Sequence, residues 1–294
     1  MKLDPLSLQL FVSVVEEGTI AAAAAREHIA AAAVSKRISE LECQLDTTLL
    51  VRSNKGMTVT AAGDALANMA RSVLSDLDNL ALQMKDFSSG TRGSVRVLAN
   101  ISAITQFLPA ELKSFLADHP MIQVQLREVA SRDVIRGVAE NGADIGIFTQ
   151  MPYRDDLQVS RYRNDELVLI VPAAHPLAAL DVVSFAQTLD YEFVGLHVGT
   201  SLNFQMLRSA SELGRSLKLR IEVNSYDAQC LMVEAGLGIG LQPKMSAQTY
   251  KSLAIKSIPL TDPWAYRQLD ICVRSYETLS PAAKLLYDHL LQHQ

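Results

Sequence analysis

Residues Thr19 to Leu45 constrain the fold of this chain most strongly, because they predict two short helices joined by a tight turn. Thr19 can cap the first helix, Ile20 to Arg26, since its side-chain oxygen can accept hydrogen bonds from free backbone N–H groups. A second helix is predicted over Ala31 to Leu45, where apolar residues recur at helical spacing: Val34, Ile38, Leu41 and Leu45. The alanines in both helices are small, so the two helices can pack closely.

Hydroxyl and cationic side chains lie outside that apolar stripe, on the opposite face of the second helix: Ser35, Lys36 and Arg37. In a helix-turn-helix the second helix lies in the major groove of DNA, where such groups reach base edges and phosphates. Two strand-like runs then surround a turn, which predicts a hairpin over Leu49 to Thr60. In such a wing Arg52 and Lys55 are placed to contact phosphate, although ordinary solvated charge is the alternative for both.

Two more helices flank these elements. Residues 6 to 17 are predicted as a first helix with Ser7 as its cap. Thr60 can cap a long helix from Ala61 to Phe87, whose apolar positions are three or four residues apart: Leu66, Met69, Val73, Leu77, Leu80, Met84 and Phe87. This spacing is close to a heptad seam and favours helix pairing between subunits. Packing of the seam against its own domain is the alternative.

From Ser94 onward the pattern alternates between strands and helices. The predicted strands are Val95 to Ala99, Ile122 to Glu128, Asp144 to Phe148, Glu166 to Val171, Phe193 to His197, Leu217 to Val223, Gly238 to Gln242 and Leu269 to Val273. The helical patterns include Leu108 to Asp118, Asp133 to Asn141, Leu202 to Leu213 and Ala228 to Ala235. Such alternation predicts mostly parallel sheets flanked by helices, an α/β architecture that binds ligands at the carboxyl ends of its strands.

Small polar residues recur where predicted strands pass into helices: Asn100-Ile101-Ser102, Ala130-Ser131, Gly199-Thr200-Ser201 and Asn224-Ser225. Free N–H groups and the helix dipole make such helix starts suitable for an anion, most simply a carboxylate. Any one of these residues taken alone is better explained as a plain helix cap. Their recurrence at the same topological position is what favours a binding site.

Several motifs occur in a specific order along the chain. Those near the amino terminus are Leu10-Phe11-Val12, Glu16-Glu17-Gly18-Thr19, Ala33-Val34-Ser35-Lys36-Arg37-Ile38, Leu41-Glu42, Leu49-Leu50-Val51-Arg52 and Thr58-Val59-Thr60-Ala61-Ala62-Gly63. Later ones are Asp144-Ile145-Gly146-Ile147, Leu169-Ile170-Val171-Pro172, His175-Pro176-Leu177 and Glu234-Ala235-Gly236-Leu237-Gly238-Ile239-Gly240. In these motifs and in its length, the chain resembles the LysR-type transcriptional regulators.

The resemblance implies a winged helix-turn-helix over residues 1–60, a linker helix and hinge over 61–90, and an effector-binding domain over 91–294. That domain is expected to resemble periplasmic binding proteins, with lobe I at about 91–162 and 268–294 and lobe II at about 163–267. The expected effector site between the lobes comprises Asn100, Ile101, Ser102, Ser131, Phe148, Thr149, His197, Thr200, Ser201, Ser225 and Gln242. A structural role is the alternative for His197.

The sequence departs from the family pattern at two places. Ala30, Ala31 and Ala32 stand where the family usually has a Ser-Gln-Pro type entry to the recognition helix, so a capping oxygen and a base-reading amide are both missing. Loss of a cap typically costs about 0.5–2 kcal/mol. Glu27 stands where the family usually has leucine, which places an acid near the turn and is expected to weaken general DNA affinity.

Composition and missing motifs exclude several other classes. The net charge is −5, and residues 1–60 hold six cations against seven acids, so DNA binding depends on the four cations of the second helix and hairpin. No Walker loop, G-x-S-x-G, H-E-x-x-H or C-x-x-C motif occurs, which argues against an enzyme, a metal and any cofactor. The three cysteines are expected to be buried free thiols. With neither a signal peptide nor a membrane-spanning stretch, we expect a cytoplasmic protein.

Together these features predict a regulator that binds promoter DNA as a homodimer or homotetramer, with contacts from Ala31, Ala32, Ser35, Lys36, Arg37, Arg52 and Lys55. Two-fold symmetry implies two half-sites about one helical turn, or a multiple of it, apart. A small organic anion is expected to modulate DNA binding and activity. A metabolite sensor or solute-binding protein that does not bind DNA is the alternative. The effector, the operator, and the choice between activation and repression are not encoded in any recognisable pattern.

Overall fold

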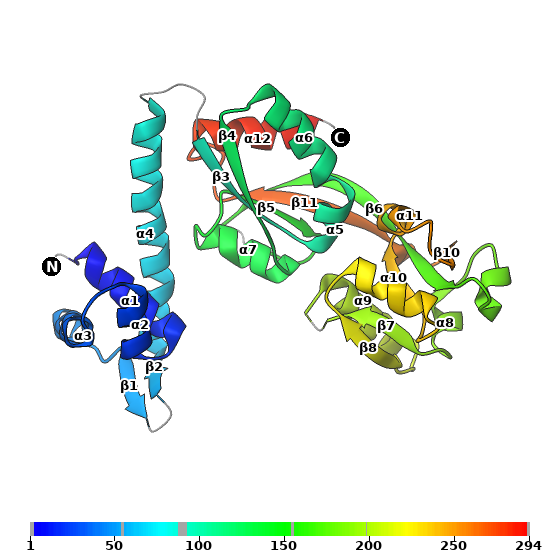
Figure 1. Ribbon diagram of the computed structural model, residues 1–294, viewed down its shortest axis with the longest axis horizontal. Helices are drawn as coiled ribbons and strands as arrows, with labels where there is room; N and C mark the ends of the chain where they lie inside the picture. Colours follow the sequence, from blue (N-terminus) through cyan, green and yellow to red (C-terminus); the bar gives the residue numbers. More distant parts are fainter. Residues whose placement is uncertain (1–2, 54–55, 88–92, 154–155, 198, 293–294) are drawn as a thin grey trace. The chain divides into compact units, whose positions relative to one another are not determined.

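The structure is a computed structural model that describes residues 3–53, 56–87, 93–153, 156–197 and 199–292 (Figure 1). It divides into two compact units. The N-terminal unit comprises Met1–Gly90 with Glu140–Gly142, and the C-terminal unit comprises Thr91–Ala139 with Ala143–Gln294. Each unit has its own apolar core, so each is described by itself.

The N-terminal unit consists of helices followed by a hairpin and a long helix: α1 Pro5–Glu17, α2 Ile20–Arg26, α3 Ala31–Leu45, β1 Leu50–Ser53, β2 Gly56–Val59 and α4 Ala61–Phe87. The bounds predicted for α2, α3 and α4 are confirmed. Val34, Ile38 and Leu41 are buried as predicted, and they pack with Phe11 of α1 and Ala23 of α2 in one core. This arrangement is the predicted helix-turn-helix with its hairpin.

The helix caps in this unit follow the predictions in three cases out of four. Thr19 caps α2 by accepting from the N–H of Ala22 at 3.1 Å, and Thr60 caps α4 by accepting from the N–H of Gly63 at 3.0 Å. Ala30 precedes α3 and makes no side-chain cap, as its methyl group requires. The prediction of Ser7 as the cap of α1 is wrong. Asp4 takes that place, and its carboxylate accepts from the N–H of Ser7 at 3.3 Å.

The C-terminal unit opens with lobe I, which contains β3 Gly93–Ala99, α5 Ile101–Gln106, α6 Leu108–Asp118, β4 Ile122–Glu128, α7 Ser131–Ala139 and β5 Ile145–Thr149. The strand β6 Gln158–Pro172 then leads into lobe II. Lobe II contains η1 Pro176–Ala179, α8 Phe185–Thr188, β7 Phe193–Leu196, α9 Ser201–Glu212, β8 Leu219–Val223, α10 Tyr226–Glu234, β9 Gly240–Pro243, α11 Lys244–Thr249, β10 Ile255–Pro259 and η2 Pro263–Ala265.

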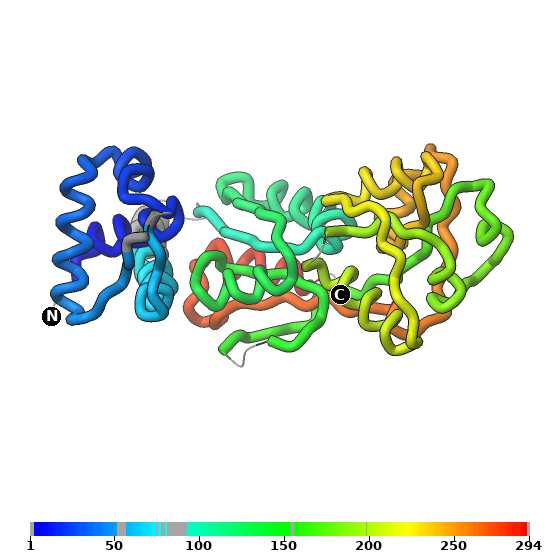
Figure 2. The backbone as a smooth tube through the Cα atoms, turned by 90° about the horizontal axis from the view of Figure 1, so that it is seen from below, coloured from blue at the N-terminus to red at the C-terminus, as the bar shows by residue number. Residues whose placement is uncertain are grey.

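The chain then returns to lobe I through β11 Tyr266–Val273 and ends in α12 Pro281–Gln292 (Figure 2). Ile271 of β11 and Leu286 of α12 pack in the same buried cluster as Val95 and Val97 of β3. A separate buried cluster, which includes Leu169, Phe193 and Ile258, forms the core of lobe II. The predicted α/β architecture with two lobes is therefore confirmed.

The prediction of mostly parallel sheets is wrong. β3 pairs in parallel with β4 and β5, and β7 pairs in parallel with β8. The other pairings in this unit are antiparallel: β11 with β5, and β6 with β9, β10 and β11. The prediction failed because β6 and β11 carry the chain between the lobes in opposite directions. No predicted strand corresponded to β10, whose residues 255–259 alternate in burial too weakly to stand out.

Two of the three cysteines, Cys230 and Cys272, are buried as expected, but Cys43 is exposed because it lies off the apolar stripe of α3.

In the described part of the chain, no single helix is long and apolar enough to cross a membrane. The bent pair α1 and α2 meets that length and composition only when taken together, across a bend of 119°.

Gly63 at the start of α4 allows the helix to approach the hairpin closely. A Cβ atom added there would lie 2.3 Å from the carbonyl oxygen of Leu49 and 2.8 Å from Cγ1 of Val59. In an ordinary helix, Gly→Ala stabilises by about 1 kcal/mol. Here we predict the opposite sign: Gly63→Ala should lower the free energy of unfolding by about 1–3 kcal/mol, because the backbone must shift.

Urea unfolding followed by circular dichroism measures this change. Ala65→Gly is the matched control, since Ala65 is exposed on the same helix and its loss should cost only about 1 kcal/mol of helix propensity. A Gly63→Ala protein at least as stable as the wild type would contradict the packing described for α4.

Candidate functional site

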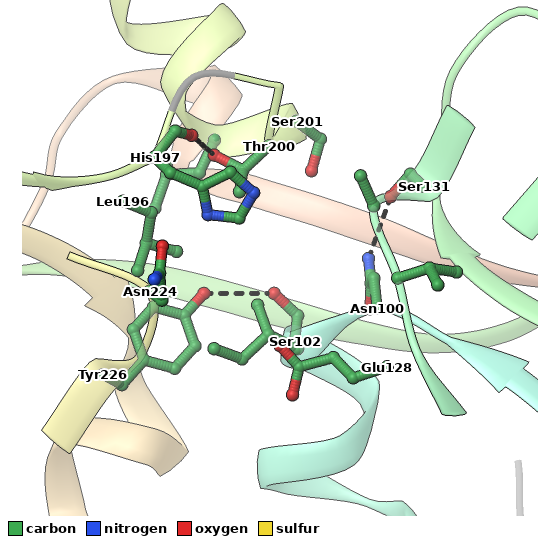
Figure 3. A pocket seen from close by; sticks show the side chains of 14 residues that line it. Asn100, Ser102, Glu128, Ser131, Leu196, His197, Thr200, Ser201, Asn224 and Tyr226 are labelled. Atoms are coloured by element: carbon green, nitrogen blue, oxygen red, sulfur yellow. Dashed lines mark hydrogen bonds between the residues drawn. The ribbon is translucent and has the colours of Figure 1, made fainter. Parts of the chain in front are cut away.

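A cavity of about 170 Å³ lies between the two lobes of the C-terminal unit (Figure 3). This volume is far larger than the ~10–15 Å³ needed for one water molecule, so it suits a small organic ligand. The carboxyl ends of β3 and β4 form its lobe I side, and the carboxyl ends of β7 and β8 form its lobe II side. Ligands of α/β sheets characteristically bind at such strand ends.

Seven of the eleven residues predicted for the effector site line this cavity: Asn100, Ile101, Ser102, Ser131, His197, Thr200 and Ser201. They come from chain positions far apart in sequence, which confirms that the strand ends meet at one place. Their contact with an effector stays a prediction. The remaining lining residues are Glu128, Val129, Ala130, Leu196, Leu202, Asn224 and Tyr226.

The other four predicted residues lie outside the lining. Phe148 is fully buried with Val134 behind β5, because neighbouring residues of a strand face opposite sides and Ile147 takes the other side. Thr149 is also buried and accepts a hydrogen bond from Asn100. Ser225 caps α10, and Gln242 is buried beside Cys230, with 3.2 Å between Nε2 and Sγ. These four residues therefore do not line the cavity, and each contacts other parts of the protein instead.

Asn100 holds the lobe I side of the cavity together. Its Oδ1 accepts from the N–H of Ala103 at 3.0 Å, which caps α5. Its Nδ2 donates to Ser131 Oγ at 3.0 Å and to Thr149 Oγ1 at 2.8 Å. The ends of β3 and β5 and the start of α7 are thus joined by one buried side chain.

Thr200 organises the lobe II side. Its hydroxyl accepts from the N–H of Asn203 at 3.2 Å and donates to the carbonyl of His197 at 3.3 Å. Asn203 in turn donates to the carbonyl of Leu196 at 3.0 Å. The start of the twelve-residue helix α9 is therefore fixed against the end of β7. The free N–H groups of its first turn supply positive potential at the cavity, as do those of α7.

The charged groups of the lining limit what the cavity can bind. The described lining residues include no lysine or arginine, and Glu128, which is exposed, is the one carboxylate among them. A bound anion would therefore be recognised by N–H groups and hydroxyls, at a distance from Glu128. Groups of three or more metal-binding side chains in suitable geometry are absent from the described residues.

Tyr226 is the lining residue that sequence reasoning should have found and did not. It is the first residue of α10, directly after the predicted cap Ser225, and it is only 2% exposed. A buried aromatic ring suggests core packing, but the Tyr226 hydroxyl lies 3.3 Å from Ser102 Oγ. These two hydroxyls form what we call the floor of the cavity. The available signal for Tyr226 was its place at the strand-to-helix junction after β8, where the other predicted site residues also occur at such junctions.

On α3, the predicted DNA contacts have different environments. Ala31, Ala32 and Lys36 are exposed, and Ser35 is half-buried. The Lys36 side chain is 77% exposed, and its Nζ lies 3.8 Å from Glu40 Oε1. Arg37 instead forms an ion pair with Asp4 at 2.5 Å and donates to Ser7 Oγ at 3.2 Å. Lys36 is therefore the most accessible of the predicted α3 cations.

Glu27 lies at the end of α2, beside the turn, as predicted, and its effect on DNA affinity stays a prediction. Its carboxylate accepts from Ser13 Oγ at 2.5 Å and from Gln9 Nε2 at 2.7 Å, and its side chain is 14% exposed. These hydrogen bonds from Glu27 link the C-terminal end of α2 to α1. Of the predicted wing residues, Lys55 lies outside the described residues, as does the side chain of Arg52, which belongs to β1.

The seam predicted on α4 begins later than expected. Leu66 is buried in the core of the N-terminal unit. Four large apolar side chains further along the helix are 43–60% exposed: Met69, Val73, Leu77 and Leu80. Met84 and Phe87 lie in α4, but their side chains are outside the described part of the structure. An exposed apolar row of this kind marks an interaction surface.

Comparisons with known proteins agree with this architecture. Residues 6–64 match the family model described as "Bacterial regulatory helix-turn-helix protein, lysR family", and residues 88–294 match "LysR substrate binding domain". Among curated proteins of Escherichia coli K12, the chain is 27% identical to the HTH-type transcriptional regulator YbhD, over 99% of this chain and 92% of that protein. It is 28% identical to the HTH-type transcriptional regulator YnfL, over 99% of both chains.

A solved structure of full-length CbnR with its target DNA superposes with a TM-score of 0.73, at 20% identity, over 99% of this chain and 100% of that chain. At this identity the superposition shows a shared fold. The helix-turn-helix, the long helix and the two-lobed unit therefore occur together in one known architecture.

Proposed function

The chain belongs to the LysR family of bacterial transcriptional regulators, and we propose that a small carboxylic acid bound between its two lobes modulates how it binds promoter DNA. The observation that carries this proposal is the cavity, because four strand ends and four helix starts converge on it without a lysine or arginine in the described lining. Backbone N–H groups and hydroxyls can bind a carboxylate there by hydrogen bonds and the helix dipole.

Within the cavity, the proposed acid-binding groups are the polar side chains that line it and that sit at helix starts: Asn100, Ser102, Ser131, Thr200 and Ser201. Ile101 and His197 complete the proposed contact set from the same lining. Phe148, Thr149, Ser225 and Gln242 support the site from behind. A carboxylate binds best at the starts of α7, α9 and α10, since each of these helices is long enough to have a dipole at its end.

On the DNA side, α3 enters the major groove and the hairpin follows the phosphate backbone. Lys36 is exposed and ready for phosphate contact, and Ser35 is positioned beside it. Arg37 can reach DNA only after leaving Asp4, so its ion pair competes with DNA contact. Exposed Ala31 and Ala32 supply methyl groups, which can contact thymine methyls but cannot donate to a base.

The exposed row on α4 supports a homodimer or homotetramer in which this helix pairs with its counterpart. Two copies then present two α3 helices to half-sites related by two-fold symmetry. The domain division follows the same logic: residues 1–60 bind DNA, 61–90 link and pair, and 91–294 bind the effector. We place the protein in the cytoplasm, where promoter DNA is found.

The charge on Lys36 offers a direct test of the DNA surface. Lys36→Ala should weaken binding to all DNA fragments by a similar factor and should reduce the slope of log K against log salt by about 1, because one counterion fewer is released. Fluorescence anisotropy over a salt series measures both quantities. Lys113→Ala is the charge-matched control, since Lys113 is exposed on α6. An unchanged slope in Lys36→Ala would remove this residue from the interface.

The effector site is tested by removing two cavity hydroxyls that come from different lobes. The double variant Thr200→Val with Ser102→Ala should abolish any effect of small carboxylic acids on DNA binding, while DNA binding itself persists. Thr200→Ser keeps the hydroxyl and the helix cap, so it should keep the response. Screening acids of three to ten heavy atoms against the DNA-bound protein measures this. A normal response in the double variant would place the acid elsewhere.

A further inference from the structure

A buried ion pair lies directly behind the cavity floor. Arg267 of β11 stands opposite Asp165 of β6 in the strand register. Its Nε donates to Asp165 Oδ1 at 2.8 Å, and its Nη2 donates to Oδ2 of the same carboxylate. The Arg267 side chain is 7% exposed and that of Asp165 is fully buried. Gln106 of α5 also donates to Asp165 Oδ2, at 3.0 Å.

Arg267 also reaches the cavity wall through Ser102. Its Nη2 donates to Ser102 Oγ at 3.1 Å, and Ser102 Oγ lies 3.3 Å from the hydroxyl of Tyr226. Both Ser102 and Tyr226 line the cavity, as Figure 3 shows. A guanidinium has donors and no acceptor, so Ser102 must accept from Arg267. The ion pair therefore fixes the direction of the hydrogen bond between Arg267 and Ser102.

The two floor hydroxyls carry two protons and share one hydrogen bond, so one proton is left over. That proton cannot be donated to Arg267, which accepts nothing. Among the described residues, neither hydroxyl has an acceptor other than its partner. Whether Ser102 or Tyr226 donates within the pair, the remaining O–H is left for whatever occupies the cavity.

Two more observations show that the floor stays a donor. Burial raises the pKa of Tyr226 and the Arg267 charge opposes that rise only in part, so the phenol keeps its proton. Burial also opposes the charge of Arg267, but Asp165 keeps the pKa of Arg267 raised, so the guanidinium stays charged. The Nη1 of Arg267 is buried without a hydrogen-bond partner among the described residues, which leaves this group with donors in excess.

The floor also joins the two lobes. Ser102 belongs to α5 of lobe I and Tyr226 to α10 of lobe II. The ion pair behind them lies on β6 and β11, the two strands that carry the chain between the lobes. A ligand that accepts from this hydroxyl pair therefore contacts the junction at which both lobes and both crossing strands meet.

We propose that Arg267, held in place by Asp165, is a positioning residue that makes the Ser102–Tyr226 pair a hydrogen-bond donor, so that the cavity selects ligands presenting an acceptor oxygen and rejects those presenting an ammonium. This inference rests on the proposed effector site and adds the residue that sets its polarity. Arg267 acts through Ser102 and Tyr226, since it interacts with both side chains but is not itself part of the cavity lining.

The test compares small acids with matched amines on the full-length protein. Propionate and benzoate are the acid probes, and propylamine and benzylamine are the amine probes, with binding measured by ligand-observed NMR. An unmatched donor at a buried site typically costs about 5- to 150-fold in binding. We therefore expect wild-type protein to bind each acid at least about 10-fold tighter than its amine.

Variants of the ion pair then separate positioning from folding. Arg267→Gln leaves Asp165 unpaired and buried, which can unfold the domain. The double variant Asp165→Asn with Arg267→Gln removes both charges together and keeps polar side chains at both positions. Circular dichroism verifies folding of each variant. Arg208→Gln is the matched control, because Arg208 also pairs with a carboxylate, Glu212, but is 64% exposed on α9.

We expect the double variant to lose the acid preference about 10-fold, while Arg267→Lys retains most of it because lysine also only donates. In a background that carries both Ser102→Ala and Tyr226→Phe, the same double variant should cause no further loss, because both hydroxyls on which Arg267 acts are gone. If the ion pair had a purely structural role, its loss would weaken the binding of acids and of amines equally, and the ratio of the two affinities would be unchanged.

Two results would overturn the inference in distinguishable ways. In the first, wild-type protein prefers acids and Thr200→Val no longer binds them, but the ion-pair variants keep the preference for acids over amines. Arg267 then does not set the polarity of the cavity, and the proposed acid site stands. If wild-type protein shows no preference for acids over amines, both the donor floor and the proposed acid site are wrong.

Discussion

The antiparallel pairing of β6 with β11 is the constraint on which the C-terminal unit depends. Residues 158–166 of β6 pair with β11, and residues 167–172 pair with β9 and β10 in the other lobe. One continuous strand thus belongs to both lobes, and β11 returns beside it. This register places Arg267 opposite Asp165 and brings the ends of four other strands together around one cavity.

The proposed effector site at this junction would recognise its ligand mainly through partial charges. Asn100 and Thr200 fix the helix starts on either side, so N–H groups and hydroxyls are preorganised before a ligand arrives. Arg267 is paired with Asp165, and in our proposal it acts on the cavity through Ser102 and Tyr226. An exposed Glu128 on the rim leaves room for an acid only near the helix starts and the floor. Shape and hydrogen-bond direction then determine specificity.

The N-terminal unit shows a similar use of internal pairs. Asp4 caps α1 and also holds Arg37, while Glu27 is held by Ser13 and Gln9. These contacts keep two of the acids near α3 engaged within the unit. Lys36 stays exposed, so a chain with a net charge of −5 still presents a cation on the helix proposed to read DNA.

Local patterns predicted local structure well. Thr19, Thr60 and the stripe Val34, Ile38, Leu41 located α2, α3 and α4 at both ends, because caps and helical spacing act within a few residues. Sequence reasoning failed where distant residues decide the outcome. Three features depend on how the strands pair: the antiparallel direction of β6 and β11, the side of β5 on which Phe148 lies, and the neighbours of Arg267. The hydrophobic pattern does not encode this pairing for strands that are buried on both faces.

Tyr226 and Ser7 show a different kind of failure. A tyrosine at a helix start has the sequence signature of a core residue, and its role depends on where its hydroxyl ends up. Asp4 and Ser7 are both good caps, and the choice between them is decided by Pro5, which favours the first turn of a helix. For α1 the ambiguity lies between two residues of similar chemistry, and for Tyr226 it lies between two roles of one residue.

The central claim is that a small acid bound between the lobes changes DNA binding by the same chain. Anisotropy titration of full-length protein into labelled DNA from upstream of its own gene, over a salt series with and without an acid that binds the cavity, measures this most directly. We predict a steep loss of affinity with salt and a change in Kd of about 5- to 150-fold when the acid is saturating. A Kd that is insensitive to salt, or identical with and without the bound acid, would contradict the account.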